Sequence, residues 1–440
     1  MQEIEQTAAG HLSEPHYLRT VTELGDAQPI VTNQDIYAEG GMKLLTAGSK
    51  FDSSVFERLI RHKLMPPLDE CLSIENPVTG AGLSEVAHGL LEQDAQLRCI
   101  LPFMPTLAEI SGWLLDVPLN PALAFKLTVM REQRPDLFRH SLYIALLALY
   151  LGYRSGLERR QMVDLATSAL LHDIGILHVD PVLLDRSHRL SESERRHLYA
   201  HPVTAWLVVR SYPACSGEVL KAILQHHERL DGSGYPKGLR GNEIGLFGQI
   251  IAVAEIVASR YGADKPQYEA LRLETILKLN SRRYGAQLIG FLNIFRADDE
   301  AAPPCGEQDY AAIREKLFRL SAVLSGWKSL RQMQPPADGV LFDFVEAFIA
   351  NLEVGLLDAG VNPHAVERNM LGMEEGTRAC FEARVLLEEA EWQLRSVLHT
   401  IRRRQAEAEL PTDPGVRLAF AEWIEEADEL LHPPPEKNGA

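Results

Sequence analysis

The chain has 440 residues and a formal net charge of −17, with 46% hydrophobic and 24% charged residues. This length allows two or three domains, and the composition is typical of a globular protein. The negative charge argues against a nucleic-acid polymer as partner, because a phosphate backbone needs basic patches. The most apolar run, residues 141–153, is shorter than the roughly 20 residues of a membrane-spanning helix. With no secretory leader evident, we expect a cytoplasmic protein without a membrane span.

The five cysteines, at positions 71, 99, 215, 305 and 380, are odd in number and contain no C-x-x-C pair. This spacing predicts neither a disulfide framework nor a zinc knuckle. It is consistent with a reducing cytoplasm.

Residues 1–80 carry the clearest strand signal and predict a small α+β module. Segments 35–38 and 42–45 flank Gly40-Gly41 and predict a β-hairpin, and residues 53–64 predict a short helix. Two readings stay open for this module: a docking or sensing function, or a stabilising appendage.

Residues 75–82 predict a linker, after which residues 81–300 form a second region. Its pattern from about 120 to 290 is almost wholly helical, with Asn120 as a helix cap and Pro121 in the first turn. Residues 137–151 are apolar nearly all round, which predicts a buried helix.

Two more helices are predicted in this region. The first covers residues 160–174 and is stopped by Gly175, and the second covers 216–227 and runs into the turn 232–234.

Residues 301–440 are rich in helix-forming residues and predict a helical C-terminal region. Segments 340–357 and 377–407 have the pattern of long amphipathic helices, whose apolar faces suit packing on the rest of the chain or homodimerisation. Residues from 433 onward predict a frayed tail.

Histidines and carboxylates are concentrated between residues 140 and 255. They are His140, His172, Asp173, His201, His226, His227 and Glu255. Imidazoles mixed with carboxylates suit a borderline or hard divalent metal better than a thiolate site would, and these seven residues are numerous enough for two ions. An isolated buried histidine is more often a hydrogen-bonded core residue. The prediction of a metal centre therefore rests on the occurrence of these seven residues together.

Several strings in this block resemble the HD-GYP family, a branch of the HD-superfamily phosphohydrolases that cleaves cyclic di-GMP. The matching strings are His140, His172-Asp173-Ile174-Gly175, His201-Pro202, the eleven residues from His226 to Pro236, and Ala252-Val253-Ala254-Glu255. The similarity covers roughly residues 120–290. It implies an all-helical HD-type metal-dependent phosphohydrolase domain. With the small α+β N-terminal region and the helical C-terminal region indicated by the sequence pattern, we expect a mainly α chain.

The resemblance also implies two divalent ions, iron or manganese, and a third in some members. A hydroxide bridging the metals would hydrolyse cyclic di-GMP to pGpG or GMP, with Asp173 and His172 as catalytic residues and Asp173 as the bridging ligand. The metal ligands implied are His140, His172, Asp173, His201, His226, His227 and Glu255. The substrate would be contacted by Arg229, Gly234, Tyr235, Pro236 and Lys237. Asp136 stands where some members bind the third metal, but we expect it to be a solvated acid at a helix start.

The chain departs from the family pattern at three places. The lysine of the His-Asp-x-Gly-Lys turn is replaced by Ile176, and the last ligand is Glu255 where the family has aspartate, with Ala258 in place of a second aspartate. The Arg-Pro-Tyr segment is altered to 265–268, Lys-Pro-Gln-Tyr. Losing a charge-assisted hydrogen bond costs roughly 1.5–3 kcal/mol, which predicts slower turnover unless Arg229 or Lys237 compensates.

Three functions therefore stay open. The first is an active cyclic di-GMP phosphodiesterase. The second is a weak or silent member that binds cyclic di-GMP or a signalling partner, such as a diguanylate cyclase, through its Gly-Tyr-Pro loop. The third is an HD hydrolase acting on another nucleotide.

Overall fold

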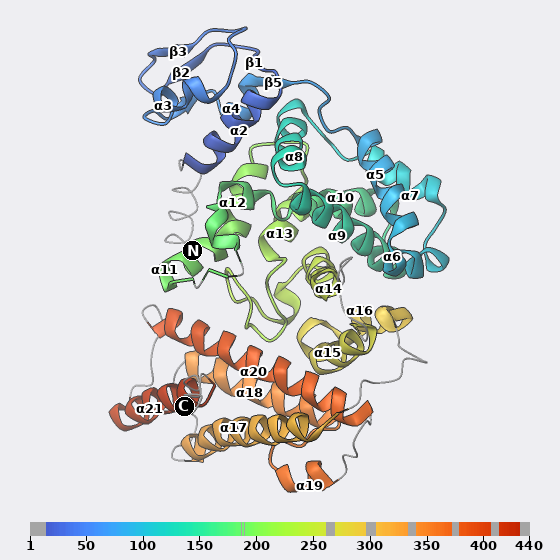
Figure 1. Cartoon of the computed structure of the whole chain (residues 1–440), viewed down its shortest axis with the longest axis vertical. Coiled ribbons are helices and arrows are strands. Elements are labelled where there is room, and N and C mark those ends of the chain that lie inside the picture. The colour runs from blue at the N-terminus through green and yellow to red at the C-terminus, as the bar shows by residue number, and fades with distance from the viewer. Residues whose placement is uncertain are drawn as a thin grey trace. The chain divides into compact units, whose positions relative to one another are not determined.

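The computed structural model describes residues 15–185, 187–188, 190–260, 269–295, 305–332, 340–371, 378–405 and 413–431. Helices dominate these residues, which confirms the mainly α fold class (Figure 1). They pack as two units. The first contains residues up to 228, 234–238 and 242–260, and the second contains 229–233, 239–241 and 269 onward. The three-part division predicted from sequence is finer than this grouping and stays a prediction.

The first unit begins with α2 (Pro15–Ala27) and two small antiparallel sheets. One sheet pairs β1 (Ile30–Thr32) with β5 (Leu72–Ile74), and the other has the order β3 (Lys43–Leu45), β2 (Ile36–Ala38), β4 (Leu64–Met65). Ile36 lies opposite Leu45, so the predicted hairpin is confirmed. The predicted helix at 53–64 is shorter: η1 (Ser53–Val55) and α3 (Phe56–Leu59) are followed by strand, and α4 (Leu68–Cys71) precedes β5.

Helices make up the rest of this unit. They are α5 (Gly80–Gln93), α6 (Ala95–Ile100), η2 (Leu101–Phe103), α7 (Leu107–Leu115), α8 (Pro121–Gln133), α9 (Pro135–Arg154), α10 (Arg159–Leu171), η3 (Ile174–His178), η4 (Pro181–Leu184), α11 (Glu192–Tyr199), α12 (His201–Val209), α13 (Gly217–Gln225) and α14 (Leu246–Arg260). A short turn, η5 (Gly241–Glu243), precedes α14.

Local chemistry explains several of these boundaries. Asn120 accepts a hydrogen bond from the Leu123 N–H and Pro121 opens α8, as predicted. The expected linker at 75–82 ends earlier, because Thr79 caps α5 through the Gly82 N–H and so begins the helix at Gly80. Helix α9 is the centre of the unit: it is buried from Ser141 to Gly152 and packs on α8, α10 and α14.

The second unit is a helical bundle. Its elements are α15 (Glu269–Tyr284), α16 (Ala286–Phe291), η6 (Leu292–Phe295), α17 (Glu307–Gln332), α18 (Val340–Asp358), α19 (Val366–Leu371), α20 (Arg378–Gln405) and α21 (Pro414–Leu431). The two long helices predicted here correspond to α18 and α20. Their apolar faces join a continuous core in which Trp327 packs on Phe342 and Trp423. The predicted tail from 433 and the altered segment 265–268 lie outside the described residues.

Cys305 and Cys380 form a disulfide between the residues before α17 and the start of α20. Our expectation that the cysteines form no disulfide was therefore wrong for this pair. The two positions are 75 residues apart in sequence, and helix packing brings their Cα atoms to 6.5 Å. The spacing of the two cysteines in the sequence does not indicate that they lie close together.

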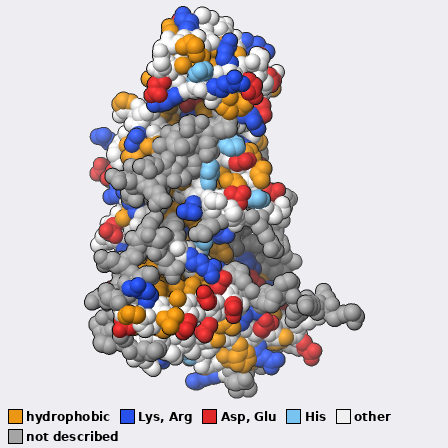
Figure 2. Space-filling view, turned by 90° about the vertical axis from the view of Figure 1, so that its left-hand side faces the viewer, with side chains coloured by type: hydrophobic (Ala, Val, Ile, Leu, Met, Phe, Trp, Pro, Cys, Tyr) orange, Lys and Arg blue, Asp and Glu red, His pale blue; other side chains and the backbone are white. Residues whose placement is uncertain are grey.

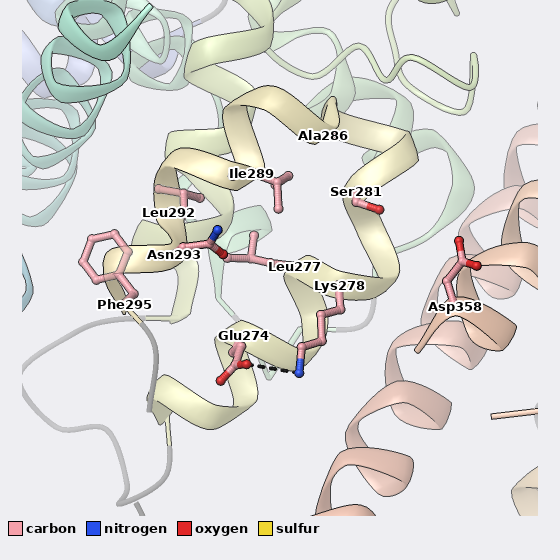
Figure 3. Close-up of a pocket in the computed structure, with 11 residues that line it drawn as sticks. Glu274, Leu277, Lys278, Ser281, Ala286, Ile289, Leu292, Asn293, Phe295 and Asp358 are labelled. Carbon is pink, nitrogen blue, oxygen red and sulfur yellow. Dashed lines mark ion pairs between the residues drawn. The ribbon is translucent and has the colours of Figure 1, made fainter. Parts of the chain in front are cut away.

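A cavity of about 300 Å³ lies in the second unit among α15, α16 and η6 (Figure 3). Its charged side chains are paired: Lys278 lies 3.1 Å from Glu274, and Asp358 lies 3.6 Å from Arg282. Across the part of the chain that the structure describes, no helix combines the length and apolar character needed to cross a bilayer.

Candidate metal centre

The His172-Asp173 pair lies at the end of α10. The helix ends at Leu171, His172 is its C-cap, and Asp173 leads into η3. The sequence predicted that Gly175 stops α10, but this residue lies inside η3. A Cβ atom there would be 2.3 Å from the His201 carbonyl oxygen and 2.7 Å from the Ala205 nitrogen. Glycine is therefore needed for η3 to pack against the first turn of α12, which begins with His201.

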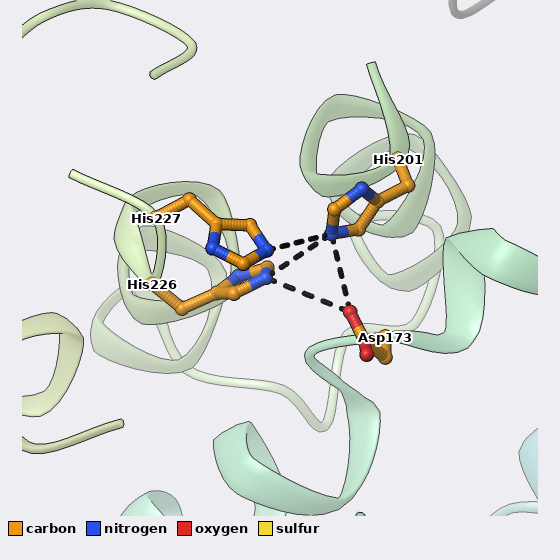
Figure 4. A group of neighbouring side chains, drawn as sticks. All are labelled: Asp173, His201, His226 and His227. Carbon is orange, nitrogen blue, oxygen red and sulfur yellow. Dashed lines mark hydrogen bonds and ion pairs between the residues drawn. The ribbon is translucent and has the colours of Figure 1, made fainter. Parts of the chain in front are cut away.

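The second histidine pair follows α13 in the same way. The helix ends at Gln225 with His226 as its C-cap, so His227 is already beyond the helix that the sequence predicted to contain both. Their rings lie 4.2 Å apart at an angle of 47°. Both imidazoles turn toward His201 (Figure 4).

All seven predicted ligands come together in two groups that share Asp173. The first group is Asp173, His201, His226 and His227, and the second is His140, His172, Asp173 and Glu255; within each group the ligand atoms lie within 4.8 Å of one another. In the first group, Asp173 Oδ1 is 3.2 Å from His201 Nε2 and 3.6 Å from His226 Nε2. Its other oxygen, Oδ2, faces the second group, 3.4 Å from His172 Nε2.

The second group is completed by two helices that flank this turn. Glu255 of α14 places Oε1 2.9 Å from His172 Nε2 and 3.1 Å from Nε2 of His140, which α9 carries. The glutamate at this position therefore reaches the cluster despite its extra methylene. The His140 side chain is 31% exposed, so the group reaches solvent. Figure 2 shows histidine side chains at the surface of one face, beside acidic ones.

Three of the imidazoles are oriented by the backbone. Nδ1 of His172, His201 and His226 each lies 2.7 Å from a carbonyl oxygen three residues earlier, on Ala169, Leu198 and Ile223 respectively. Since Nδ1–H donates to the carbonyl, Nε2 keeps its lone pair and points into the cluster. The carbonyls were not predicted as functional groups, although histidine directly after a helix is the signal that would have located them.

This arrangement fits divalent cations. His201 Nε2 lies 3.3 Å from His226 Nε2 and 3.1 Å from His227 Nε2. Two lone pairs at this distance repel unless a proton or a cation lies between them, and the buried His172 Nε2 and Asp173 Oδ1 have no hydrogen-bond partner. The two groups of donor atoms could each hold a metal ion.

The pKa values of the carboxylates and of His226 agree with that role. Burial raises the pKa of Asp173, but the neighbouring histidines outweigh it and hold the pKa well below the usual value; Glu255 behaves in the same way beside His140 and His172. Burial lowers the pKa of His226 to about 4. Burial also lowers the pKa values of His140 and His172, but the carboxylates beside them outweigh it and raise both, so metal binding there would release protons.

Comparisons with known proteins identify relatives of part of the chain. The family model for the HD domain matches residues 122–288. A "3'3'-cGAMP-specific phosphodiesterase 1" of Vibrio cholerae is 34% identical over 32% of this chain and 32% of its own length. The "Cyclic di-GMP phosphodiesterase PdeB" of Borreliella burgdorferi is 34% identical over 26% and 30%. Residues 122–288 of the chain are an HD domain of the HD-GYP type. The chain spans about a third of the length of these relatives.

One solved structure is also similar to the chain. It is that of Bd1817, an HDG"Y"P protein from Bdellovibrio bacteriovorus, which aligns with 60% of this chain and 94% of its own at 16% identity and a TM-score of 0.34.

The Gly-Tyr-Pro loop of the HD-GYP domain lies against the first metal group. The Tyr235 ring stacks on the His227 ring at 4.6 Å and on the Tyr199 ring of α11 at 4.4 Å. The backbone N–H of Tyr235 donates to the His227 carbonyl. Tyr199 was not predicted from sequence, and its position two residues before His201 was the only available signal. The stack fixes the plane of the His227 imidazole.

The predicted substrate contacts are distributed over the loop. Gly234 and Pro236 are buried on either side of Tyr235. The backbone N–H of Lys237 donates to Glu228 at 2.6 Å while the side chain is exposed. Arg229 belongs to the second unit, where its guanidinium lies 4.6 Å from the Tyr284 ring centroid. Contact of these residues with a substrate stays a prediction.

Two departures from the HD-GYP pattern take on a structural meaning. Ile176 is 7% exposed and packs with Val179 and Leu183 in an apolar cluster. The position of the family lysine is therefore part of the core in this chain. Asp136 is an exposed acid in the first turn of α9 and belongs to neither metal group, as expected for a solvated residue.

Proposed function

We propose that the protein is a metal-dependent phosphodiesterase that hydrolyses cyclic di-GMP to pGpG or GMP. The observation that carries this proposal is the sharing of Asp173 between two groups of ligands, with one carboxylate oxygen facing each group. The names of the HD-GYP relatives, which are phosphodiesterases of cyclic dinucleotides, support the reaction class.

In this proposal each of the seven side chains has a stated function in metal binding. Asp173 would bridge two ions, with His201, His226 and His227 completing one site and His140, His172 and Glu255 the other. The mixed nitrogen and oxygen donors suit iron or manganese. When bound, such ions activate water and neutralise the charge that develops on a phosphoryl group. The carbonyl-anchored imidazoles would hold this geometry without reorganisation.

Substrate recognition would come from the loop next to the centre. Tyr235, stacked between His227 and Tyr199, presents an aromatic surface of the kind on which a base stacks. Lys237 would supply positive charge toward phosphates in place of the lysine that Ile176 replaces, and the same role for Arg229 remains a prediction from the sequence. A diguanylate cyclase or another signalling protein as partner, and homodimerisation, remain predictions from the sequence.

A second substrate, 3'3'-cGAMP, is favoured by the names of three Vibrio cholerae relatives, which are 27–34% identical to this chain over about a third of its length. Both dinucleotides carry the same pair of phosphodiesters and differ in one base. The two are separated by comparing kcat/KM on each. A preference for cyclic di-GMP of tenfold or more, about 1.4 kcal/mol, would support our assignment.

The proposal is tested by anaerobic incubation of iron- or manganese-loaded protein with cyclic di-GMP, followed by chromatography of the products. We expect pGpG or GMP from the wild type and none from Asp173→Ala, which should also lose metal from both sites. The matched control is Asp136→Ala, an exposed acid outside both groups. Metal bound at both sites without turnover would instead support a silent cyclic di-GMP binder, which the loss of the motif lysine favours.

A further inference from the structure

A buried ion pair connects the N-terminal part of the first unit to the HD-GYP domain. Lys126 of α8 lies 2.8 Å from Asp69 of α4, with side chains 2% and 11% exposed. Burial lowers the pKa of Lys126, and Asp69 opposes that shift. A charge in such a place needs its partner, because removing one member leaves the other uncompensated in a low-dielectric environment.

Aromatic rings surround this ion pair. The Lys126 ammonium lies 3.6 Å from the centroid of the Tyr17 ring, a close cation–π contact, and the Tyr17 hydroxyl donates to Asp69. Tyr17 in turn stacks on the buried His178 at 4.7 Å, and Lys126 Nζ lies 3.5 Å from His178 Nε2. We call Tyr17, Asp69, Lys126 and His178 the lysine clamp.

The lysine clamp includes His178 of η3, the segment that follows Asp173, the proposed bridging residue. His178 is the last residue of η3, and Asp173 is the residue that starts it. Both α2 and α8 pack on η3, as does α12 with His201 at its start. A short 3₁₀ helix held at its far end by the clamp, and packed at Gly175 against His201, has little freedom to move Asp173.

We propose that Tyr17, Asp69 and Lys126 are positioning residues for the metal centre, acting through His178 and η3. The inference rests on the proposed function, since it assigns a task to residues around the centre. Tyr17 and Asp69 lie outside residues 122–288, so the N-terminal part of this chain supplies a component that the HD domain lacks by itself. This role differs from both functions considered for residues 1–80, a docking or sensing function and a stabilising appendage.

The position of the N-terminal part on α8 does not depend on the clamp alone. The Val78 N–H donates to Thr128 at 2.8 Å, Arg131 donates to the Asn76 carbonyl at 2.9 Å, and Gln28 donates to Glu132 at 2.9 Å. These bonds should keep the region docked when the clamp is weakened. Removal of the Asp69 charge therefore tests positioning rather than undocking.

The test is an Asp69→Asn variant of the full chain, measured by Mn²⁺ titration and by hydrogen exchange of residues 174–178. We expect Mn²⁺ affinity to fall about tenfold, the scale at which orienting groups outside a metal's own ligands act, and exchange at 174–178 to become faster. The control is Glu39→Gln, which breaks the exposed pair with Lys63 in the same region. It should change neither quantity.

A second variant separates positioning from a general loss of stability. The double variant Asp69→Asn with Lys126→Met removes the stranded charge but also lacks the clamp, so it should recover melting temperature while Mn²⁺ affinity stays low and exchange at 174–178 stays fast. A lower melting temperature with unchanged affinity and exchange in Asp69→Asn would overturn the proposal, as would recovery of Mn²⁺ affinity in the double variant. Wild-type protein that binds Mn²⁺ without turnover would remove the proposed function and leave this inference standing, whereas wild type that binds no Mn²⁺ would overturn both.

Discussion

Ile176 illustrates how one residue can change the meaning of a motif. The family places a lysine at this position, and the sequence alone suggests a missing phosphate contact. In the structure the side chain is packed among Val179 and Leu183, with Leu137 and Leu198 against the same cluster. The surroundings of Ile176 are therefore apolar, like the residue itself.

Restoring the lysine should not restore a phosphate contact. We expect Ile176→Lys to lower the free energy of unfolding by about 2 kcal/mol, because an ammonium would enter an apolar cluster without a partner. Urea unfolding and turnover measured on the same preparation would check this. Ile176→Leu, which conserves volume, is the control and should cost less than about 1.5 kcal/mol. Undiminished stability with faster hydrolysis in the lysine variant would show that the position faces the substrate.

At the scale of elements, the sequence predicts what local chemistry determines. The Asn120-Pro121 start of α8 and the Gly40-Gly41 hairpin follow from capping and turn preferences, and the seven ligands follow from motif strings. Helix ends near the centre were misplaced, because Gly175 is required by the approach of α12 and not by a helix terminus. The Lys126–Asp69 pair and the Cys305–Cys380 disulfide depend on contacts between distant segments, which no local pattern reports.

The packing of η3 on α12 gives a direct prediction for Gly175→Ala. The added methyl would collide with backbone atoms of His201 and Ala205, so η3 and α12 must separate. We expect a loss of about 1–3 kcal/mol in unfolding free energy and weaker metal binding, measured by denaturation and Mn²⁺ titration. Gly89→Ala in α5 is the control, since its Cβ would meet nothing within 4 Å and alanine favours a helix. Equal behaviour of the two variants would contradict this account.

At the scale of the whole molecule, the two units carry different stabilising features. All seven proposed ligands belong to the first unit, and the disulfide lies in the second. Metal binding and disulfide formation should therefore act on different parts of the chain.

Calorimetry can separate the two effects. A chelator should lower the unfolding temperature of the first unit, whereas Cys305→Ser should destabilise the second by about 2–4 kcal/mol under non-reducing conditions. Cys99→Ser, at an exposed free cysteine, is the control for the thiol change. Peptide-resolved hydrogen exchange would assign each transition to its unit. A chelator that loosened residues 305–431 as much as 140–255 would argue against this separation.

The carbonyl-anchored imidazoles have an electrostatic consequence. Two of them, His172 and His226, lie at the C-terminal ends of α10 and α13, where each helix dipole concentrates partial negative charge. Together with the carboxylates of Asp173 and Glu255, these helix ends favour cations over a dianionic dinucleotide. Binding should consequently be ordered, with divalent ions before nucleotide, and titration calorimetry of the metal-stripped protein should detect no uptake of cyclic di-GMP. Bound metal ions would therefore neutralise the charge that otherwise keeps the dinucleotide away from the centre.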